Sequence, residues 1–253
     1  GFVDYYSNDI IALASSAWLG PAYQVTSQIN LINPGGEAQQ PHRDYHLGFL
    51  TDDEGEQYPA HVHPLSGMLT LQGAVAHVDM PVESGPTMLL PHSQKYVPGF
   101  LAWRRPEFKA YFLEHYSQLS LAKGDAMFFN PAVFHAGGHN RTNHIKRMAN
   151  LLQISSAFGR ALEAVDREAI ANAIYPALLE RAGSGAADDA LQHAIAAAAE
   201  GYAFPTNLDR DQPIGGLAPP SQADVVRQAL AQRWEPTALA SELSRHSARR
   251  RTA

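Results

Sequence analysis

The chain has 253 residues, of which 45% are hydrophobic and 17% charged, with a formal net charge of −6. This balance excludes a disordered chain and allows a well-buried core. The net negative charge argues against nucleic acid as a partner, and no apolar run reaches the roughly 18 residues of a membrane span. The absence of cysteine excludes disulfides, zinc–thiolate sites and thiol nucleophiles. Together with the lack of a visible signal peptide, this favours a cytoplasmic protein.

The first segment, residues 1–22, is predicted to be mostly helical and to end at Gly20-Pro21. Apolar residues recur in it at helical spacing, which predicts a buried face. The residues of this face are Ile10, Leu13, Ala14, Ala17 and Trp18.

Residues 23–156 carry short apolar segments separated by proline and glycine, which is typical of all-β organisation. Within them, residues 98–117 form an insertion that is rich in aromatic and basic residues and partly helical in pattern. Residues 157–253 are predicted to be helical, and the last arginines are predicted to be a frayed, solvated end. The predicted helices cover 159–181, 187–200, 221–234 and 236–246. We expect the three parts to form a single domain, 1–253.

The first chemical motif is His42-Arg43-Asp44, in a loop rich in glycine and proline that follows a strand-like run. His42 and Asp44 are two residues apart, so in an extended segment both side chains leave the same face. A distal histidine, His135, follows a short apolar strand and an Asn-Pro break. One His-x-Asp pair and one remote histidine form the ligand set that holds non-haem Fe(II) and leaves coordination positions open.

A second His-x-Asp pair, His77 and Asp79, also fits the motif. With 12 histidines in the chain, chance alone gives roughly half of one such match. An isolated pair of this kind is often only a hydrogen-bonded surface pair. The motif alone therefore leaves the choice between the two pairs open.

Beyond these motifs, the chain resembles the phytanoyl-CoA dioxygenase family of Fe(II)/2-oxoglutarate oxygenases over roughly residues 23–156. The family's hallmark turn is represented by Ser84-Gly85-Pro86 leading to Pro91-His92-Ser93, with a degenerate second half. In the family this turn lies between the metal carboxylate and the distal histidine. The resemblance therefore assigns the ligand position to His42 and Asp44, and places His77-Val78-Asp79 in the strand that enters the turn. The other matching segments are 42–49, 123–135, Asn140 and Arg147.

The resemblance implies a mainly β fold with flanking α-helices around a double-stranded β-helix (jelly-roll) core. It implies that His42, Asp44 and His135 bind Fe(II) and act as the catalytic centre. Arg147, twelve residues beyond His135, would hold the far carboxylate of the co-substrate 2-oxoglutarate; Lys146 and Arg141 are the alternatives. O2 is the second co-substrate, and succinate and CO2 are released. Many members carry serine where this chain has Gly137.

Further residues are expected near the site. Gln28 and Asn30 alternate on one strand face and are expected to point toward the co-substrate. His46, His63, Trp103 and Arg105 are expected to contact substrate, and their aromatic and basic character suits an anionic small molecule. The resemblance implies a hydroxylase-type oxygenase, with a catalytically silent jelly-roll binding module or another cupin-like metal enzyme as the alternatives. The sequence gives no oligomeric state.

Overall fold

The structure is a computed structural model that describes residues 1–159 and 161–252. Its contacts group the chain into two compact units, Gly1–Val25 with Ser155–Ala253, and Thr26–Ile154. The strands of the described residues all lie between Gln24 and Ser155, as the all-β pattern of residues 23–156 predicts. The expectation of one domain stays a prediction.

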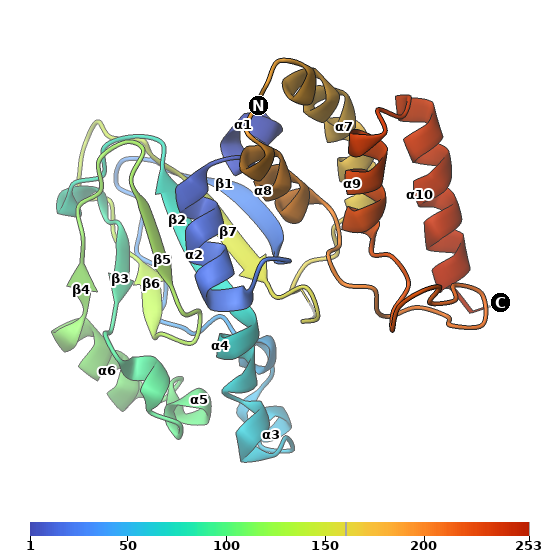
Figure 1. The fold of residues 1–253 in the computed structure, drawn as a ribbon. Coiled ribbons are helices and arrows are strands. Elements are labelled where there is room, and N and C mark those ends of the chain that lie inside the picture. The colour runs from blue at the N-terminus through green and yellow to red at the C-terminus, as the bar shows by residue number, and fades with distance from the viewer. Residues whose placement is uncertain (160, 253) are drawn as a thin grey trace. The chain divides into compact units, whose positions relative to one another are not determined.

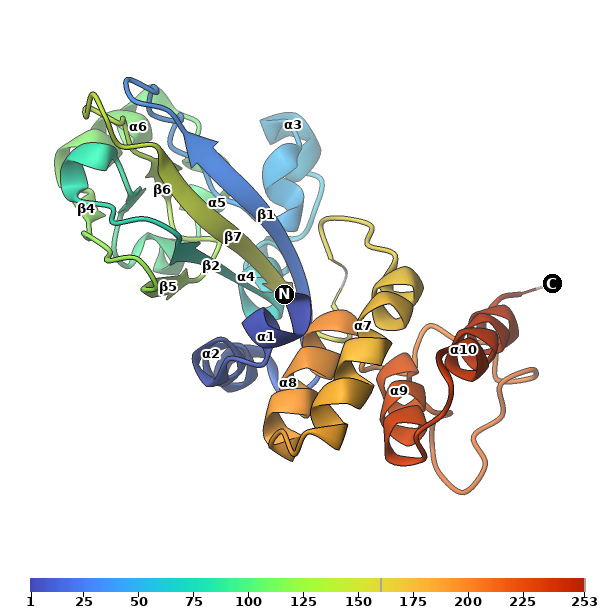
Figure 2. The same cartoon turned by 90° about the horizontal axis from the view of Figure 1, so that it is seen from above.

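The larger sheet has four strands in the order β1-β7-β2-β5 (Figures 1 and 2). Buried residues occur on both faces of β7, with Ala149 on one face and Leu152 on the other, which suits its place between β1 and β2. β2 and β5 pair antiparallel, with Gln72 opposite Phe129. The strands are β1 (Gln24–Ile32), β2 (Thr70–Ala76), β5 (Ala126–Phe129) and β7 (Arg147–Ser155).

The smaller sheet has three strands, β3 (Thr87–Leu89), β4 (Ser117–Gln118) and β6 (His135–Gly137), in the order β4-β3-β6. β3 pairs antiparallel with β6, so that Leu89 lies opposite His135. The neighbouring positions, Met88 and Ala136, are buried in an aromatic cluster. One end of this sheet therefore carries the predicted distal ligand.

Short helices fill the connections within the β unit. The insertion at residues 98–117 holds α5 (Gly99–Ala102) and α6 (Pro106–His115), and so is helical in part, as its pattern predicts. Phe112 of α6 packs with Trp103 and Phe134 against the smaller sheet. The other short helices are η1 (His46–Phe49), α3 (Asp52–Gly55), η2 (Ala60–Val62), α4 (Leu65–Leu69), η3 (Val82–Ser84) and η4 (Ser93–Lys95).

The helical unit has its own core, in which Tyr175, Leu178, Ile195, Leu239 and Leu243 are fully buried. Its helices are α1 (Phe2–Tyr6), α2 (Asp9–Leu19), α7 (Arg167–Gly183), α8 (Asp188–Ala198), α9 (Gln222–Ala231) and α10 (Pro236–Arg250). Four helices were expected after residue 157, and four are described there.

Two helix starts follow local capping chemistry. Ser221 and Asp224 form a capping box at α9, as their spacing predicts. α7 begins later than the predicted residue 159, because the side chain of Asp166 accepts a hydrogen bond from the backbone of Ala169 and sets the helix start there.

The predicted buried face of α2 is wrong. Ile10, Leu13 and Trp18 are about half or more exposed. The buried residues are instead Ile11, Ala12 and Ser15, and the helix contacts α8. Small side chains allow a closer approach of two helices than leucine and tryptophan do, so the face with alanine and serine is the one that packs.

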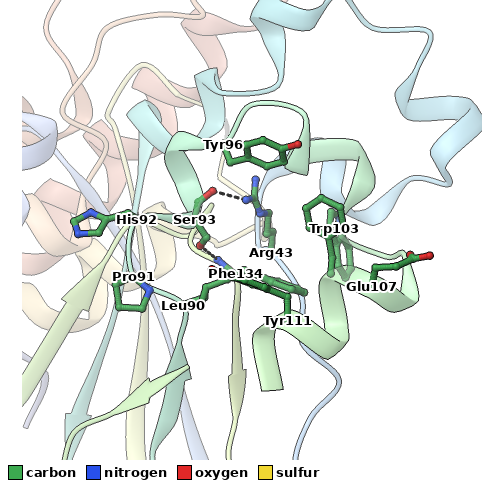
Figure 3. A pocket seen from close by; sticks show the side chains of 11 residues that line it. Arg43, Leu90, Pro91, His92, Ser93, Tyr96, Trp103, Glu107, Tyr111 and Phe134 are labelled. Carbon is green, nitrogen blue, oxygen red and sulfur yellow. Dashed lines mark hydrogen bonds between the residues drawn. The ribbon is translucent and has the colours of Figure 1, made fainter. Parts of the chain in front are cut away.

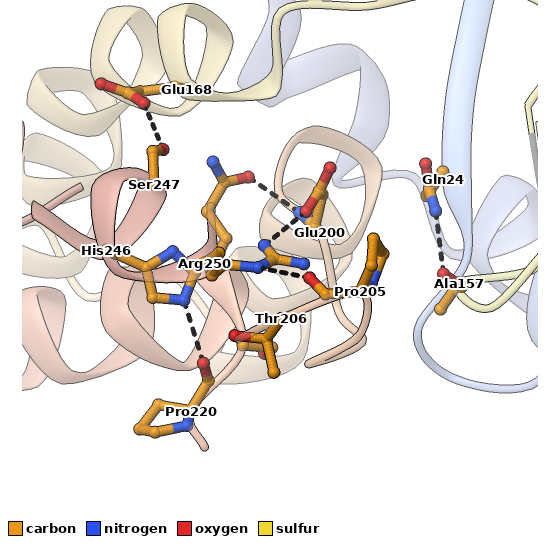
Figure 4. Close-up of polar contacts among 12 residues, drawn as sticks. Gln24, Ala157, Glu168, Glu200, Pro205, Thr206, Pro220, His246, Ser247 and Arg250 are labelled. Carbon is orange, nitrogen blue, oxygen red and sulfur yellow. Dashed lines mark hydrogen bonds and ion pairs between the residues drawn. The ribbon is translucent and has the colours of Figure 1, made fainter. Parts of the chain in front are cut away.

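The predicted frayed end is also wrong. α10 continues to Arg250, whose guanidinium pairs with Glu200 at 2.7 Å and donates to the carbonyl oxygen of Pro205 at 3.1 Å (Figure 4). Arg249 pairs with Glu242 and Asp211 in the same way. Glu200, Pro205 and Asp211 are distant in sequence from these arginines, so a local run of arginines did not reveal them. None of the helices in residues 1–159 and 161–252 combines the length and apolar character needed to cross a membrane.

Candidate metal centre

The backbone brings the two ligand segments together before any side chain is considered. The amide of His42 donates to the carbonyl oxygen of His135 at 2.8 Å, and the amide of His135 donates back to His42 at 2.9 Å. The backbone amide of Asp44 donates to the carbonyl oxygen of Pro131 at 3.0 Å. This antiparallel bridge lets the loop after β1 pair with β6, and it fixes the register of His42 against His135.

The side chains of His42, Asp44 and His135 converge. Nε2 of His42 lies 3.5 Å from one carboxylate oxygen of Asp44, and Nε2 of His135 lies 3.6 Å from the other. The ligand atoms of all three residues lie within 4.8 Å of one another. His135 is buried and the other two are half-buried. The three residues that the sequence singles out are thus gathered in one place.

Hydrogen bonds fix the orientation of both imidazoles. Nδ1 of His42 lies 2.8 Å from the carbonyl oxygen of Gln40, and Nδ1 of His135 lies 2.7 Å from that of Val133. A carbonyl oxygen can only accept, so each Nδ1 carries the proton and each Nε2 keeps its lone pair for a metal. The side-chain amide of Gln72 donates to Asp44 at 2.5 Å and holds the carboxylate between the rings.

The electrostatics favour the protonation states that a metal needs. Burial lowers the pKa of His42, and the neighbouring His135 lowers it further. Burial alone would raise the pKa of Asp44, but its neighbours His135, His42 and Gln72 bring it below its usual value. Neutral imidazoles and an ionised carboxylate are the forms that bind a divalent cation. The donor set therefore fits a divalent metal with an open coordination sphere.

Arg147 opens β7 and is 9% exposed. Its Nη1 donates to the carbonyl oxygens of Ser84 and Gly138, at 3.2 and 3.1 Å. Burial lowers the pKa of its guanidinium, and no carboxylate within residues 1–159 and 161–252 lies at ion-pair distance from it. The alternatives Lys146 and Arg141 are both exposed. Arg147 is therefore the buried cation of this segment.

Gly85 lies close to one of the carbonyl groups that accept from Arg147, and a side chain there would block this approach. Its φ of +74° is left-handed, and a Cβ there would lie 2.5 Å from the carbonyl oxygen of Gly138 and 2.4 Å from that of His139. Only glycine avoids both the strain and the clash. The hallmark turn can thus approach the end of β6 closely, and Ser84 and Gly138 can accept from one arginine.

The other predicted site residues are placed differently. On β1, Gln28 is exposed and Asn30 is half-buried. Nδ1 of His46 lies 2.6 Å from the hydroxyl of Ser66. His63, which was expected to contact substrate, is 3% exposed and lies beside the hydroxyl of Tyr45 in a packed aromatic cluster. The roles of these residues toward ligands stay predictions.

Trp103 and Arg105 differ in their exposure to solvent. Arg105 is exposed at the start of α6. Trp103 is 9% exposed, and its ring packs edge-on against Phe134. Phe134 precedes His135 on the chain, so its side chain and that of the ligand leave opposite faces of the backbone.

One polar residue of the site, Gln72, was not identified from the sequence, although a glutamine within the apolar strand Thr70–Ala76 is a visible signal. Asn140, which belongs to the segments that match the family, has a structural role. It is fully buried, and its amide donates to the carbonyl oxygens of Ile32, Asn33 and Ile145, which ties the end of β1 to the turn before β7.

A family profile described as "Phytanoyl-CoA dioxygenase (PhyH)" matches residues 4–148, more than half of the chain. The chain belongs to the phytanoyl-CoA dioxygenase family. This confirms the resemblance seen in the motifs, and the two-sheet β core is the double-stranded β-helix fold class expected of it. The match covers His42, Asp44, His135 and Arg147.

Solved structures of low identity resemble the chain. They include the α-ketoglutarate-dependent epimerase SnoN from nogalamycin biosynthesis (20% identity, TM-score 0.42, 60% of this chain and 55% of that one). Another is EctD from S. alaskensis with 2-oxoglutarate and 5-hydroxyectoine (17%, 0.47, 63% and 54%). A third is the non-heme monooxygenase ThoJ with nickel (16%, 0.45, 63% and 55%). The chain spans little more than half the length of these proteins. No curated protein matches the chain.

Proposed function

We propose that this phytanoyl-CoA dioxygenase family member is an Fe(II)/2-oxoglutarate-dependent oxygenase that hydroxylates a small molecule, with release of succinate and CO2. The observation that carries the proposal is the convergence of His42, Asp44 and His135 within 4.8 Å, with both Nδ1 atoms held by backbone carbonyls. This geometry presents two imidazole lone pairs and one carboxylate to a common point. Such a donor set leaves room for a chelating co-substrate and for O2.

Each residue of the centre has a separate task. His42 and His135 supply nitrogen ligands, and Asp44 supplies an oxygen ligand whose position Gln72 fixes. Bound iron supplies the oxidising chemistry, in which O2 is reduced while 2-oxoglutarate loses CO2 to give succinate. The protein's contribution is to hold the ligands in one orientation and to limit the access of water.

Arg147 is proposed to bind the carboxylate of 2-oxoglutarate that is far from iron. Its Nη1 is engaged by two backbone carbonyls, which are neutral, so its charge has no ionic partner in the described chain. A buried cation that lacks a counter-charge favours an anionic ligand, because pairing offsets several kcal/mol of desolvation. Arginine also matches a carboxylate through parallel N–H donors, which lysine does not.

The proposal is tested by succinate release. The purified chain is incubated with Fe(II), 2-oxoglutarate and a panel of small metabolites, and succinate is measured for each. We expect succinate that depends on iron and rises with one compound class, and a hydroxylated product that accounts for it. His77→Ala is the matched control, since His77 belongs to the competing His-x-Asp pair, and it should keep turnover. Iron and 2-oxoglutarate binding without succinate from any compound would instead indicate a binding module.

A further inference from the structure

A cavity of about 500 Å³ lies in the β unit, lined by one buried cation and mostly apolar side chains (Figure 3). Its wall includes Arg43, Leu90, Tyr96, Trp103, Tyr111 and Phe134. Its size is within the range of sites for small organic ligands. The proposed metal ligands are not among the residues that line it.

The cavity and the metal centre share the same backbone segments. Arg43 stands between His42 and Asp44, and Phe134 stands directly before His135. Side chains alternate along an extended backbone, so the ligands leave one face and Arg43 and Phe134 leave the other. The cavity therefore lies behind the metal-binding segments.

Arg43 is 3% exposed, and no carboxylate within the described residues lies at ion-pair distance from its guanidinium. Its Nη2 donates to the carbonyl oxygen of Ser93 at 2.5 Å, and its Cζ lies 4.8 Å from the centre of the Phe100 ring. Nε and Nη1 are buried and have no hydrogen-bond acceptor in the described chain. Burial of so many unused donors on a permanently charged group is costly unless a ligand accepts from them.

A second unused donor belongs to the wall of the same cavity. The indole Nε1 of Trp103 is buried and, within the described residues, has no acceptor. Figure 3 shows the Arg43 guanidinium between Tyr96 and Trp103, above Phe134. A buried tryptophan N–H usually finds a partner. The cavity thus combines a cation and a neutral donor with an apolar wall.

We propose that this cavity binds an organic carboxylate with an apolar, ring-sized body, at a site distinct from the metal centre. The carboxylate accepts from Arg43 and from the indole of Trp103. The body packs against Phe134, Tyr111 and Leu90. Glu107, which is exposed, is the carboxylate among the lining residues.

The test uses phenylacetate as the probe, titrated into the full chain without metal and followed by ligand-observed NMR. We expect saturable binding. The neutral analogue phenylacetamide and the variant Arg43→Met should both show binding about tenfold or more weaker, the loss expected for a charge-assisted hydrogen bond. Lys109→Met is the matched control, because Lys109 is a cation of α6 that does not line the cavity, and it should bind like the wild type.

Two further variants keep the result decisive. Trp103→Phe retains an aromatic ring but removes the N–H, so it should bind a few times more weakly while circular dichroism shows an unchanged fold. Arg147→Ala should bind phenylacetate normally, which separates this cavity from the proposed co-substrate position.

Other outcomes would overturn the proposal. Equal binding by the wild type and a folded Arg43→Met variant would show that Arg43 is not the anion partner. Loss of binding in Arg147→Ala would place the probe at the metal centre. Binding that is absent in the wild type and appears only in Glu107→Gln would show that Glu107 is the partner of Arg43.

Discussion

His42 and His135 exchange both of their backbone hydrogen bonds, at 2.8 and 2.9 Å, although they lie in segments far apart in the sequence. The exchange fixes both ligands in one register. Gln39 extends the same pairing by donating to the carbonyl oxygen of Gly137 at 2.9 Å. The geometry of the candidate centre therefore rests on the backbone, and single side-chain substitutions there should change chemistry more than fold.

Gln72→Leu is expected to weaken Fe(II) binding about tenfold, because a residue that orients a metal ligand typically contributes that much. The amide of Gln72 donates to Asp44 at 2.5 Å, and leucine of similar size removes only that donor. The measurement is equilibrium dialysis against iron under anaerobic conditions. Gln57→Leu, at an exposed position, is the control and should bind iron like the wild type; an equal affinity in Gln72→Leu would show that this hydrogen bond does not position the carboxylate.

Arg147→Ala should raise the 2-oxoglutarate concentration needed for half-maximal turnover on the order of a hundredfold, from loss of a charge-assisted pair worth roughly 3 kcal/mol. Arg147→Lys should recover part of this, since the charge returns without the planar fork. Lys146→Ala removes the exposed neighbouring cation and should change nothing. If the co-substrate dependence shifts in Lys146→Ala and not in Arg147→Ala, the assignment moves to Lys146.

Gly85→Ala is expected to destabilise the protein by more than Gly35→Ala. Both glycines have a positive φ, +74° and +76°, so both substitutions impose left-handed strain of about 1 kcal/mol or more. A Cβ at Gly35 meets nothing, whereas one at Gly85 meets two carbonyl oxygens. The free energies of unfolding of the two variants, measured in urea, differ by the contribution of the clash. Equal losses would mean that the hallmark turn does not need the close approach.

The capping box of α9 predicts a pH dependence of stability. Burial would raise the pKa of Asp224, but hydrogen bonds from Ser221 and the charge of Arg227 bring it below its ordinary value. A lowered folded-state pKa stabilises the fold above the unfolded-state value, and this contribution is lost as pH falls through the folded value.

Asp224→Asn should therefore lower the stability at neutral pH by roughly 0.5–1 kcal/mol, as loss of a cap does, and should flatten the decline in acid. Urea midpoints measured from neutral to acidic pH provide the test. Asp188→Asn, an exposed acid in the first turn of α8, serves as the control. An unchanged acid slope in Asp224→Asn would show that the capping box does not carry this effect.

Much of the site follows from local pattern. The spacing of His42 and Asp44, the apolar strand before His135 and the arginine that opens β7 are each readable from neighbouring residues. The extended backbone then explains why His42 and Asp44 share a face. The family resemblance resolved the choice between two His-x-Asp pairs, which the motif alone left open.

The misplaced features depend on partners that are distant in sequence. The face of α2 that packs is decided by α8, and a helical pattern cannot show which of two plausible faces meets a neighbour. The arginines of α10 are held by Glu200 and Asp211, so composition alone suggested a frayed end. The two buried donors of Arg43 that have no acceptor among the described residues are likewise visible only when the groups around them are known.

The most direct test of the metal centre is the Fe(II) content of the chain after anaerobic loading, compared across His42→Ala, Asp44→Ala, His135→Ala and the control His77→Ala. If the centre is as proposed, the wild type and His77→Ala each bind a single iron. The three ligand variants then lose tight binding while their circular dichroism spectra stay unchanged. The account would be contradicted if Asp44→Ala and His135→Ala bound iron as well as the wild type does, or if His77→Ala lost its iron.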